Sequence, residues 1–226
     1  DEVKRETDFS DASPVSTEAF SEWIIEDKFA GSRPAWENTG AMIVENVQPF
    51  ELRKLRLLNG THSLLAYSGL LAGHTYVHEA AADPKLRKLA EGLMAEAAET
   101  LPTIIKQQAP AYCDALFDRF ANASLNHKLA QIAMDGSVKL PVRILPVLEQ
   151  QTSDNSDSFS AKAVAFWLAY VLQQLENEAP INDPDAPEFQ RLSKIAVNRQ
   201  DFARRLLARL GPIRQFEKIV AQALAI

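Results

Sequence analysis

The chain has 226 residues, of which 46% are hydrophobic and 24% charged, which is the composition of a globular protein with enough apolar material for a sizeable core. Its formal net charge of −6 disfavours nucleic acid and anionic membrane surfaces as partners, because both require a basic face. The single cysteine, Cys113, excludes an internal disulfide and predicts a reducing, cytoplasmic compartment, and no apolar run reaches the roughly 20 residues of a membrane span.

Apolar residues recur at helical spacing along nearly the whole chain, and the predicted fold class is all-α. We expect residues 1–15 to be a flexible segment and residues 16–226 to form one helical domain. A short strand is expected near 41–47, with its signal at residues 41–44, and a loop at residues 151–158. The predicted helices cover about 17–29 (capped by Ser16 or Thr17), 49–73, 83–101, 110–120, 125–134 and 160–176, with two or three amphipathic helices towards the C-terminus.

The glycines exclude the common nucleotide-binding turns. None of the eight glycines is spaced as Gly-x-Gly, so both the dinucleotide fingerprint and the P-loop are missing from this chain. Strands and helices also do not alternate, as they would in a nucleotide-binding sheet. The sequence therefore predicts no dinucleotide-binding unit within these residues.

The helix predicted after Pro49 is apolar on nearly every side, which is typical of a buried helix. It nevertheless carries Lys54, Arg56, Asn59 and His62. Burying a cation or an imidazole is costly unless the group is paired or neutralised, so these side chains indicate a lined cleft. At about 100° per residue, Asn59 lies about 140° around the helix from Lys54, so the spacing permits convergence without requiring it. The alternative is that Lys54 and Arg56 extend to solvent and His62 is a hydrogen-bonded core histidine.

This segment resembles the signature of the long-chain mannitol dehydrogenase family, in which Lys is followed by Asn five residues on and by His three further. Residues 23–36 resemble the entry to that family's second domain, and residues 135–141 resemble a later motif. The likeness runs from about residue 17 to about residue 210. It implies a C-terminal helical domain related to that of 6-phosphogluconate dehydrogenase, which normally follows an N-terminal Rossmann domain that holds NAD. We therefore expect the chain to be part of a longer enzyme and to be inactive when isolated.

The resemblance also implies roles for the residues of the signature. Lys54 would be the base that takes the hydroxyl proton while hydride leaves for the nicotinamide, and the surrounding leucines and Arg56 are expected to favour its neutral form. Asn59 would donate a hydrogen bond to the developing alkoxide, and His62 would orient the substrate oxygen. Lys139 is expected to be a second substrate contact, suited to a hydroxyl or a carboxylate.

One position bears on the substrate. Gln131 stands where polyol-oxidising relatives have an arginine eight residues before Lys139, and residues 131–137 resemble the mannonate and fructuronate branch more closely. We therefore predict an NAD-dependent oxidoreductase without a metal, which interconverts a secondary alcohol and a ketone in a sugar acid held by Lys139, Gln131 and Arg56. Polyol oxidation of the mannitol 2-dehydrogenase type is the alternative substrate class.

Other patterns admit different functions. His74 and His78 lie four residues apart, a spacing that can bind a metal on a helix face, but the His-Glu-x-x-His pattern is missing. A non-catalytic helical module for binding or scaffolding is the alternative of another functional class. A basic face near the C-terminus is either solvated or docks against another domain, and it consists of Arg204, Arg205 and Arg209.

Overall fold

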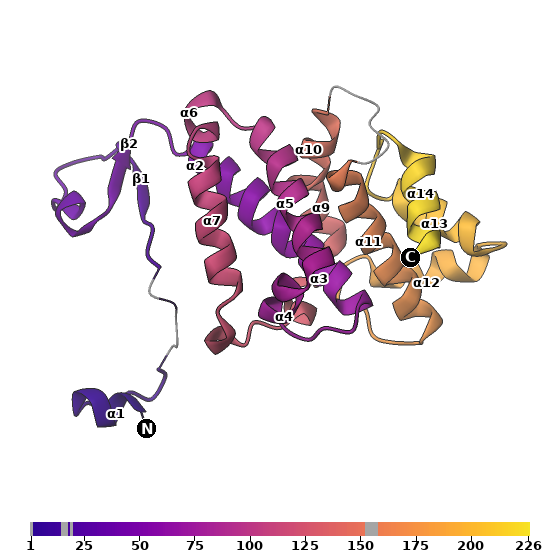
Figure 1. Ribbon diagram of the computed structural model, residues 1–226, viewed down its shortest axis with the longest axis horizontal. Coiled ribbons are helices and arrows are strands. Elements are labelled where there is room, and N and C mark those ends of the chain that lie inside the picture. Colours follow the sequence, from indigo (N-terminus) through magenta and orange to yellow (C-terminus); the bar gives the residue numbers. More distant parts are fainter. Residues whose placement is uncertain (1, 15–17, 19, 152–157) are drawn as a thin grey trace.

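The computed structural model describes residues 2–14, 18, 20–151 and 158–226, and it confirms the all-α class (Figure 1). A helical body carries an N-terminal arm that stands away from it (Figure 1). The elements of the body are α2 (Gln48–Arg53), the π-helical turn η2 (Lys54–Asn59), α3 (Gly60–Leu71), α4 (Val77–Ala82), α5 (Pro84–Glu99), α6 (Thr103–Lys106), α7 (Ala109–Phe120), the 3₁₀ turn η3 (Ala123–Leu125), α8 (Leu129–Ile132), α9 (Gly136–Arg143), α10 (Leu145–Glu149), α11 (Phe159–Glu176), α12 (Ala186–Ile195), α13 (Arg199–Ala208) and α14 (Phe216–Ala225).

The arm contains the strands of the structure. Its elements are α1 (Glu2–Thr7), β1 (Ile24–Glu26), the 3₁₀ turn η1 (Trp36–Thr39) and β2 (Met42–Val44). β1 and β2 pair in parallel with Ile24 opposite Met42, so the strand expected near 41–47 is confirmed. The helix expected over 17–29 is wrong for the described residues. Two successive β-branched residues, Ile24 and Ile25, favour an extended chain, and both pair with residues of β2.

Residues 2–7 at the beginning of the chain form the short helix α1, and the flexibility expected of residues 1–15 stays a prediction. Ser16 and Thr17, the expected helix caps, lie outside the described residues, as does most of the loop expected at 151–158. An ion pair of 2.6 Å between Glu22 Oε1 and Arg53 Nη2 fastens the arm to α2. The Arg53 guanidinium also lies over the ring of Tyr112 at 4.2 Å, which connects this contact to α7.

α3 lies at the centre of the body, where it packs against α4, α5, α8 and α11. Tyr67 of α3 and Trp167 of α11 are fully buried, and the Tyr67 hydroxyl donates a hydrogen bond to the Ala133 carbonyl. The all-round apolar sequence of this helix thus reflects an all-round burial, as its pattern predicts. Among the described helices, none is both long and apolar enough to cross a membrane.

Capping and proline positions predict most helix starts correctly. The Asp83 carboxylate accepts hydrogen bonds from the N–H groups of Lys85 and Leu86 at the start of α5, and a proline occupies the first turn there. The helices expected over 110–120 and 160–176 are confirmed as α7 and α11. The C-terminal helices α12, α13 and α14 are confirmed as well.

The helix expected over 125–134 is mostly wrong, because only α8 forms there. Asn126 adopts a left-handed conformation with φ of 45°, which interrupts a helix. Lys128 is then extended and forms an isolated antiparallel bridge with Tyr76, so this stretch bonds to the start of α4 instead of to itself. Pro141 lies inside α9.

Two glycines allow α9 to approach the central helices. A Cβ atom on Gly136 would lie 2.3 Å from Trp167 Nε1 and 2.6 Å from the Tyr67 hydroxyl, so only glycine fits at the start of α9. A Cβ atom on Gly60, at the start of α3, would lie 3.4 Å from the Arg143 carbonyl oxygen. Both ends of α9 are therefore held close to α3.

Substitution of Gly136 by alanine should destabilise the chain, because the added methyl group must displace two fully buried rings. We expect Gly136→Ala to lower the free energy of unfolding by about 1–3 kcal/mol, as for other overpacked cores. Gly31→Ala is the matched control, since a Cβ atom there meets nothing within 4 Å. Urea unfolding of both variants measures the effect, and equal stability of the two would contradict this packing.

Candidate active site

The signature residues begin in the π-helical turn η2. The Gly60 N–H bonds to the carbonyl of Leu55, five residues earlier, where an α-helix would bond four residues earlier. In α-helical geometry Asn59 lies about 140° around from Lys54, whereas a turn closed by i→i+5 bonds brings residues five apart towards one side. The structure therefore brings Lys54 and Asn59 closer to a common face than α-helical spacing indicates. Turns of this kind are rare and frequently occur at functional sites.

The two flanking cations differ in their surroundings. The side chain of Lys54 is exposed on the surface of this chain, in contrast to the leucine-enclosed environment expected for it. Arg56 is buried, and its Nη1 donates a 2.7 Å hydrogen bond to the carbonyl of Thr100 at the C-terminal end of α5. This position suits a cation because the carbonyl end of a helix is negative. The structure thus gives Arg56 a partner within the fold.

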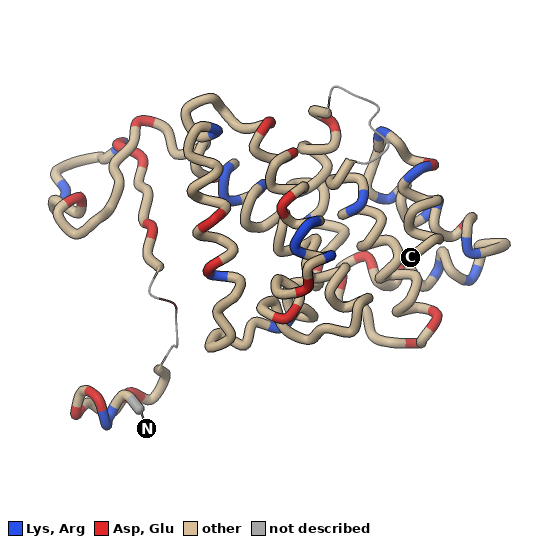
Figure 2. The backbone as a smooth tube through the Cα atoms, in the orientation of Figure 1, with Lys and Arg blue, Asp and Glu red and all other residues tan. Residues whose placement is uncertain are grey.

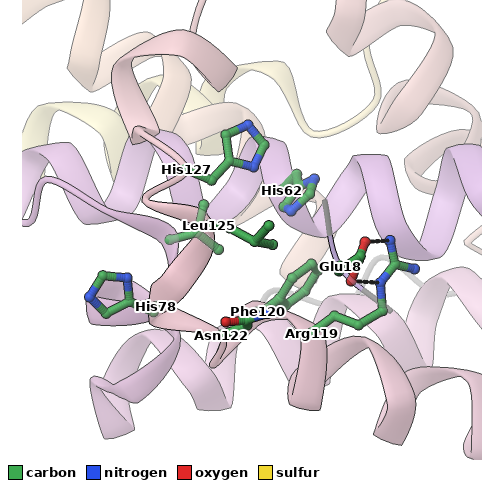
Figure 3. A pocket seen from close by; sticks show the side chains of 9 residues that line it. Glu18, His62, His78, Arg119, Phe120, Asn122, Leu125 and His127 are labelled. Carbon is green, nitrogen blue, oxygen red and sulfur yellow. Dashed lines mark hydrogen bonds and ion pairs between the residues drawn. The ribbon is translucent and has the colours of Figure 1, made fainter. Parts of the chain in front are cut away.

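His62 follows one turn later in α3 and lines a cavity of about 170 Å³ (Figure 3). Its ring centroid lies 4.6 Å from that of Phe120 and 5.5 Å from that of His127. The remaining lining residues come from the arm, α4, α7 and the segment before α8, and they are Glu18, Val77, His78, Arg119, Asn122 and Leu125. The structure therefore places His62 in a pocket, whereas Lys54, Arg56 and Asn59 do not line that pocket.

The pocket keeps His62 neutral. Burial, the neighbouring His127 and the positive charge of Arg143 together lower the pKa of His62 to about 3. A neutral imidazole has one hydrogen-bond donor and one acceptor, so at neutral pH His62 can orient a hydroxyl or carbonyl oxygen. It carries no positive charge that would repel a nearby ammonium group.

Lys139 lies on α9 and is half-buried. Its Nζ donates a 3.2 Å hydrogen bond to the carbonyl of Ile132 and lies 3.8 Å from Asp135 Oδ2. Burial and the charge of Arg143 lower the pKa of Lys139, whereas Asp135 and Asp183 act in the opposite direction. This lysine is therefore held in place by the protein and keeps donors for a ligand.

Gln131 is exposed on α8 and lines a second cavity, of about 490 Å³, together with residues such as Tyr170 and Asn182. This cavity shares no lining residue with the pocket of His62. Lys139 is nonetheless close to Gln131 in the fold, because Lys139 Nζ bonds to the carbonyl of the next residue, Ile132. The structure thus associates Gln131 with Lys139 and separates it from His62.

Two features of the site have no counterpart among the residues predicted from sequence. Glu18 of the arm forms a bidentate ion pair with Arg119 of α7, at 2.6 and 2.9 Å, which closes one side of the His62 pocket (Figure 3). These residues are 101 positions apart, so no local pattern indicates the pair. Arg143 Nη1 donates to the hydroxyl of the buried Ser63. Arg143 lies four residues after Lys139, a spacing that places both on one face of a helix, so the sequence could have identified Arg143.

The other patterns have partners within the fold. His74 Nε2 lies 3.3 Å from Asp83 Oδ2, and the ring of His78 stacks on Tyr76. Within the described residues, no three side chains of the His, Cys, Asp and Glu types are grouped as for a metal ion.

Figure 2 shows basic and acidic positions interspersed along the chain. In line with this, the three arginines of the C-terminal basic face are all paired. The pairs are Arg204 with Glu217 at 2.7 Å, Arg205 with Asp201 at 2.9 Å and Arg209 with Asp185 at 3.0 Å.

Comparison with known proteins identifies the family to which this chain belongs. The family model described as the mannitol dehydrogenase C-terminal domain matches residues 46–224. The D-mannonate oxidoreductase of Escherichia coli (strain K12) is 40% identical over 189 residues, which cover 81% of this chain and 38% of that protein. A mannitol 2-dehydrogenase of Phaeosphaeria nodorum is 37% identical over 196 residues, which cover 84% of this chain and 34% of that protein.

A solved structure is similar over nearly the whole chain. It is the Pseudomonas fluorescens mannitol 2-dehydrogenase in a ternary complex with NAD and D-mannitol. The TM-score is 0.80 at 31% sequence identity, and the match covers 98% of this chain and 46% of that one. This chain therefore spans less than half the length of each of these relatives.

The neutral state of His62 gives a prediction for the pH dependence of stability. The unfolded chain takes up a proton at this residue near pH 6.5, whereas the folded chain does so only near pH 3, so stability should fall as the pH drops between these values. Between pH 6.5 and pH 5 the loss due to His62 is at most about 2 kcal/mol. Urea unfolding should show this loss for the wild type, and the loss should be reduced in His62→Asn. A ring of His62 that titrates above pH 6 by NMR would contradict the prediction.

Proposed function

This chain belongs to the mannitol dehydrogenase family, as its C-terminal domain, and we propose that it supplies the proton-transfer side of an NAD-dependent oxidoreductase. The proposed reaction interconverts a secondary alcohol and a ketone in a sugar acid of the D-mannonate and D-fructuronate type. The observation that carries this proposal is the π-helical turn, which turns Lys54 and Asn59 towards one face, with His62 following in α3.

The proposed chemistry assigns one task to each of these side chains. Lys54 Nζ takes the proton of the substrate hydroxyl, the Asn59 amide donates a hydrogen bond to the oxygen as it becomes an alkoxide, and the neutral His62 orients that oxygen. In the reverse direction the same ammonium group returns the proton to the ketone oxygen. Lys54 must be neutral to act as the base, and a second domain covering its exposed side chain would favour that form by removing water.

The dinucleotide does not fit this chain alone. The sheet of the described residues has two short strands, and the sequence contains no glycine-rich turn that could approach a pyrophosphate. We propose that an N-terminal Rossmann domain of a longer polypeptide holds NAD and faces the exposed Lys54. We also propose that the helical chain by itself is inactive. The share of about 34–46% of each relative's length that this chain covers supports this division.

The sugar-acid class is favoured over neutral polyols by two observations. Gln131 stands where polyol-oxidising relatives are expected to have an arginine, and residues 131–137 resemble the mannonate and fructuronate branch. Two cations, Lys139 and Arg143, instead lie on one face of α9 beside the site. Mannitol 2-dehydrogenases at 37% identity keep polyol oxidation as the second candidate.

Replacement of Lys54 in the full-length protein tests the proposed base. We expect Lys54→Ala to reduce kcat for D-mannonate oxidation by about 10²–10⁴-fold, which is the usual contribution of a general base. The affinity for NAD, measured by nucleotide titration, should remain within about twofold of wild type, because Lys54 lies outside the proposed dinucleotide site.

Lys88→Ala is the matched control, since Lys88 is an exposed lysine on α5 that no part of the proposed mechanism uses. It should retain full activity. Turnover by Lys54→Ala at the wild-type rate would remove Lys54 from the mechanism. Absence of NAD-dependent oxidation of both D-mannonate and D-mannitol by the wild type would refute the proposed function as a whole.

A further inference from the structure

Arg143 is the last residue of α9 and is half-buried. Its Nη1 donates a 3.2 Å hydrogen bond to the hydroxyl of Ser63, which in turn donates to the carbonyl of Asn59 at 3.1 Å. A guanidinium group has five N–H donors, so most of those of Arg143 are not used by this contact. Arg143 therefore adjoins the signature helix, which is the helix formed by η2 and α3 that carries Lys54, Asn59 and His62. Arg143 retains N–H donors for another partner.

Arg143 forms no ion pair within 4.0 Å in the described part of the chain, and the Asp135 carboxylate acts on its charge only from a greater distance. Arg119 pairs with Glu18 and Arg53 with Glu22, whereas the buried Arg56 lacks an ion pair with a described residue, as Arg143 does, and instead donates to the Thr100 carbonyl at the negative end of α5. An enclosed cation without a counter-charge is unfavourable, because burial removes its hydration. Burial accordingly lowers the pKa of Arg143. These properties are typical of a group that meets an anion from outside the chain.

The charged side chains around Arg143 indicate where such an anion would bind. Lys139 lies four residues earlier, on the same face of α9, and the positive charge of Arg143 contributes to the lowered pKa values of both Lys139 and His62. Two carboxylates act on Lys139: Asp183 accepts hydrogen bonds from Ser137, and Asp135 Oδ2 lies 3.8 Å from Lys139 Nζ. Lys139 and Arg143 each donate one hydrogen bond to a described residue of the protein, so both retain further N–H donors that a substrate could use.

We propose that Arg143, together with Lys139, binds the carboxylate of the substrate and so determines specificity for sugar acids over neutral polyols. This inference rests on the proposed function, and it names Arg143 as the residue that selects the substrate class. The planar guanidinium presents two parallel N–H groups to a carboxylate, and Lys139 adds a point charge beside it. A neutral polyol offers only hydroxyl groups here and leaves the charge uncompensated.

The test uses the full-length protein and NADH consumption with D-fructuronate and with the neutral D-fructose. Arg143→Met should raise KM for D-fructuronate about 10–100-fold, which corresponds to the loss of a hydrogen bond to a charged group. The KM for D-fructose should change less than twofold. Arg143→Lys, which keeps the positive charge but not the two parallel N–H groups of the guanidinium, should have a KM for D-fructuronate between those of Arg143→Met and the wild type. The matched control is Arg191→Met, which removes an exposed arginine paired with Glu188 and should have wild-type constants for both substrates.

Equal losses for the two substrates in Arg143→Met, or a fall in kcat with KM for D-fructuronate unchanged, would overturn the inference and leave Arg143 a structural role. If the wild type reduces only D-fructuronate, a higher KM with kcat retained and partial rescue by Arg143→Lys support it. A wild type that reduces only D-fructose overturns the sugar-acid class while the dehydrogenase function stands. A wild type that reduces neither substrate refutes the proposed function, and this inference with it.

Discussion

The i→i+5 turn at Lys54–Asn59 is the feature on which the candidate site depends. It continues from α2 into α3 and packs against α5, α7 and α9, while the side chain of Lys54 is exposed. In α-helical geometry Lys54 and Asn59 would face directions about 140° apart. The wider turn brings them towards one side while the apolar residues between them remain in the core. The apolar residues of the turn thus hold it in the core, and they limit the surface on which Lys54 and Asn59 can meet a substrate.

The second constraint is the close approach of α9 to this helix. Gly136 admits the rings of Trp167 and Tyr67 at the start of α9, and Gly60 admits the backbone of Arg143 at its end. Lys139 lies between these two contacts, so its position relative to the signature helix is fixed by backbone packing. The hydrogen bond from Arg143 to Ser63 joins the same two elements through side chains. Lys139 has Asp135 at 3.8 Å as a counter-ion, whereas Arg143 forms no ion pair with a described residue, so the two cations together carry more positive charge than the one carboxylate balances.

Helical periodicity, helix caps and proline positions predict most of the fold correctly, including α5, α7 and α11. They fail where tertiary context decides. Ile24 and Ile25 fit a helical pattern but pair with β2, and the segment after Asn126 is extended because it bonds to the start of α4. The π-helical turn could not be predicted, because spacing arguments assume a constant angle per residue. The partner of Arg56, the Thr100 carbonyl, is 44 positions away and leaves no local signal. Arg143 could have been found from its spacing to Lys139.

The central claim is that Lys54, Asn59 and His62 meet one substrate oxygen. A crystal structure of the full-length protein with NAD and D-mannonate measures this directly. The account predicts that Lys54 Nζ, the Asn59 amide nitrogen and a ring nitrogen of His62 all lie within about 2.6–3.2 Å of the oxygen on the carbon to be oxidised. A substrate whose reacting oxygen lies beyond hydrogen-bond distance of Lys54 and Asn59, for example one bound in the cavity lined by Gln131, would contradict it.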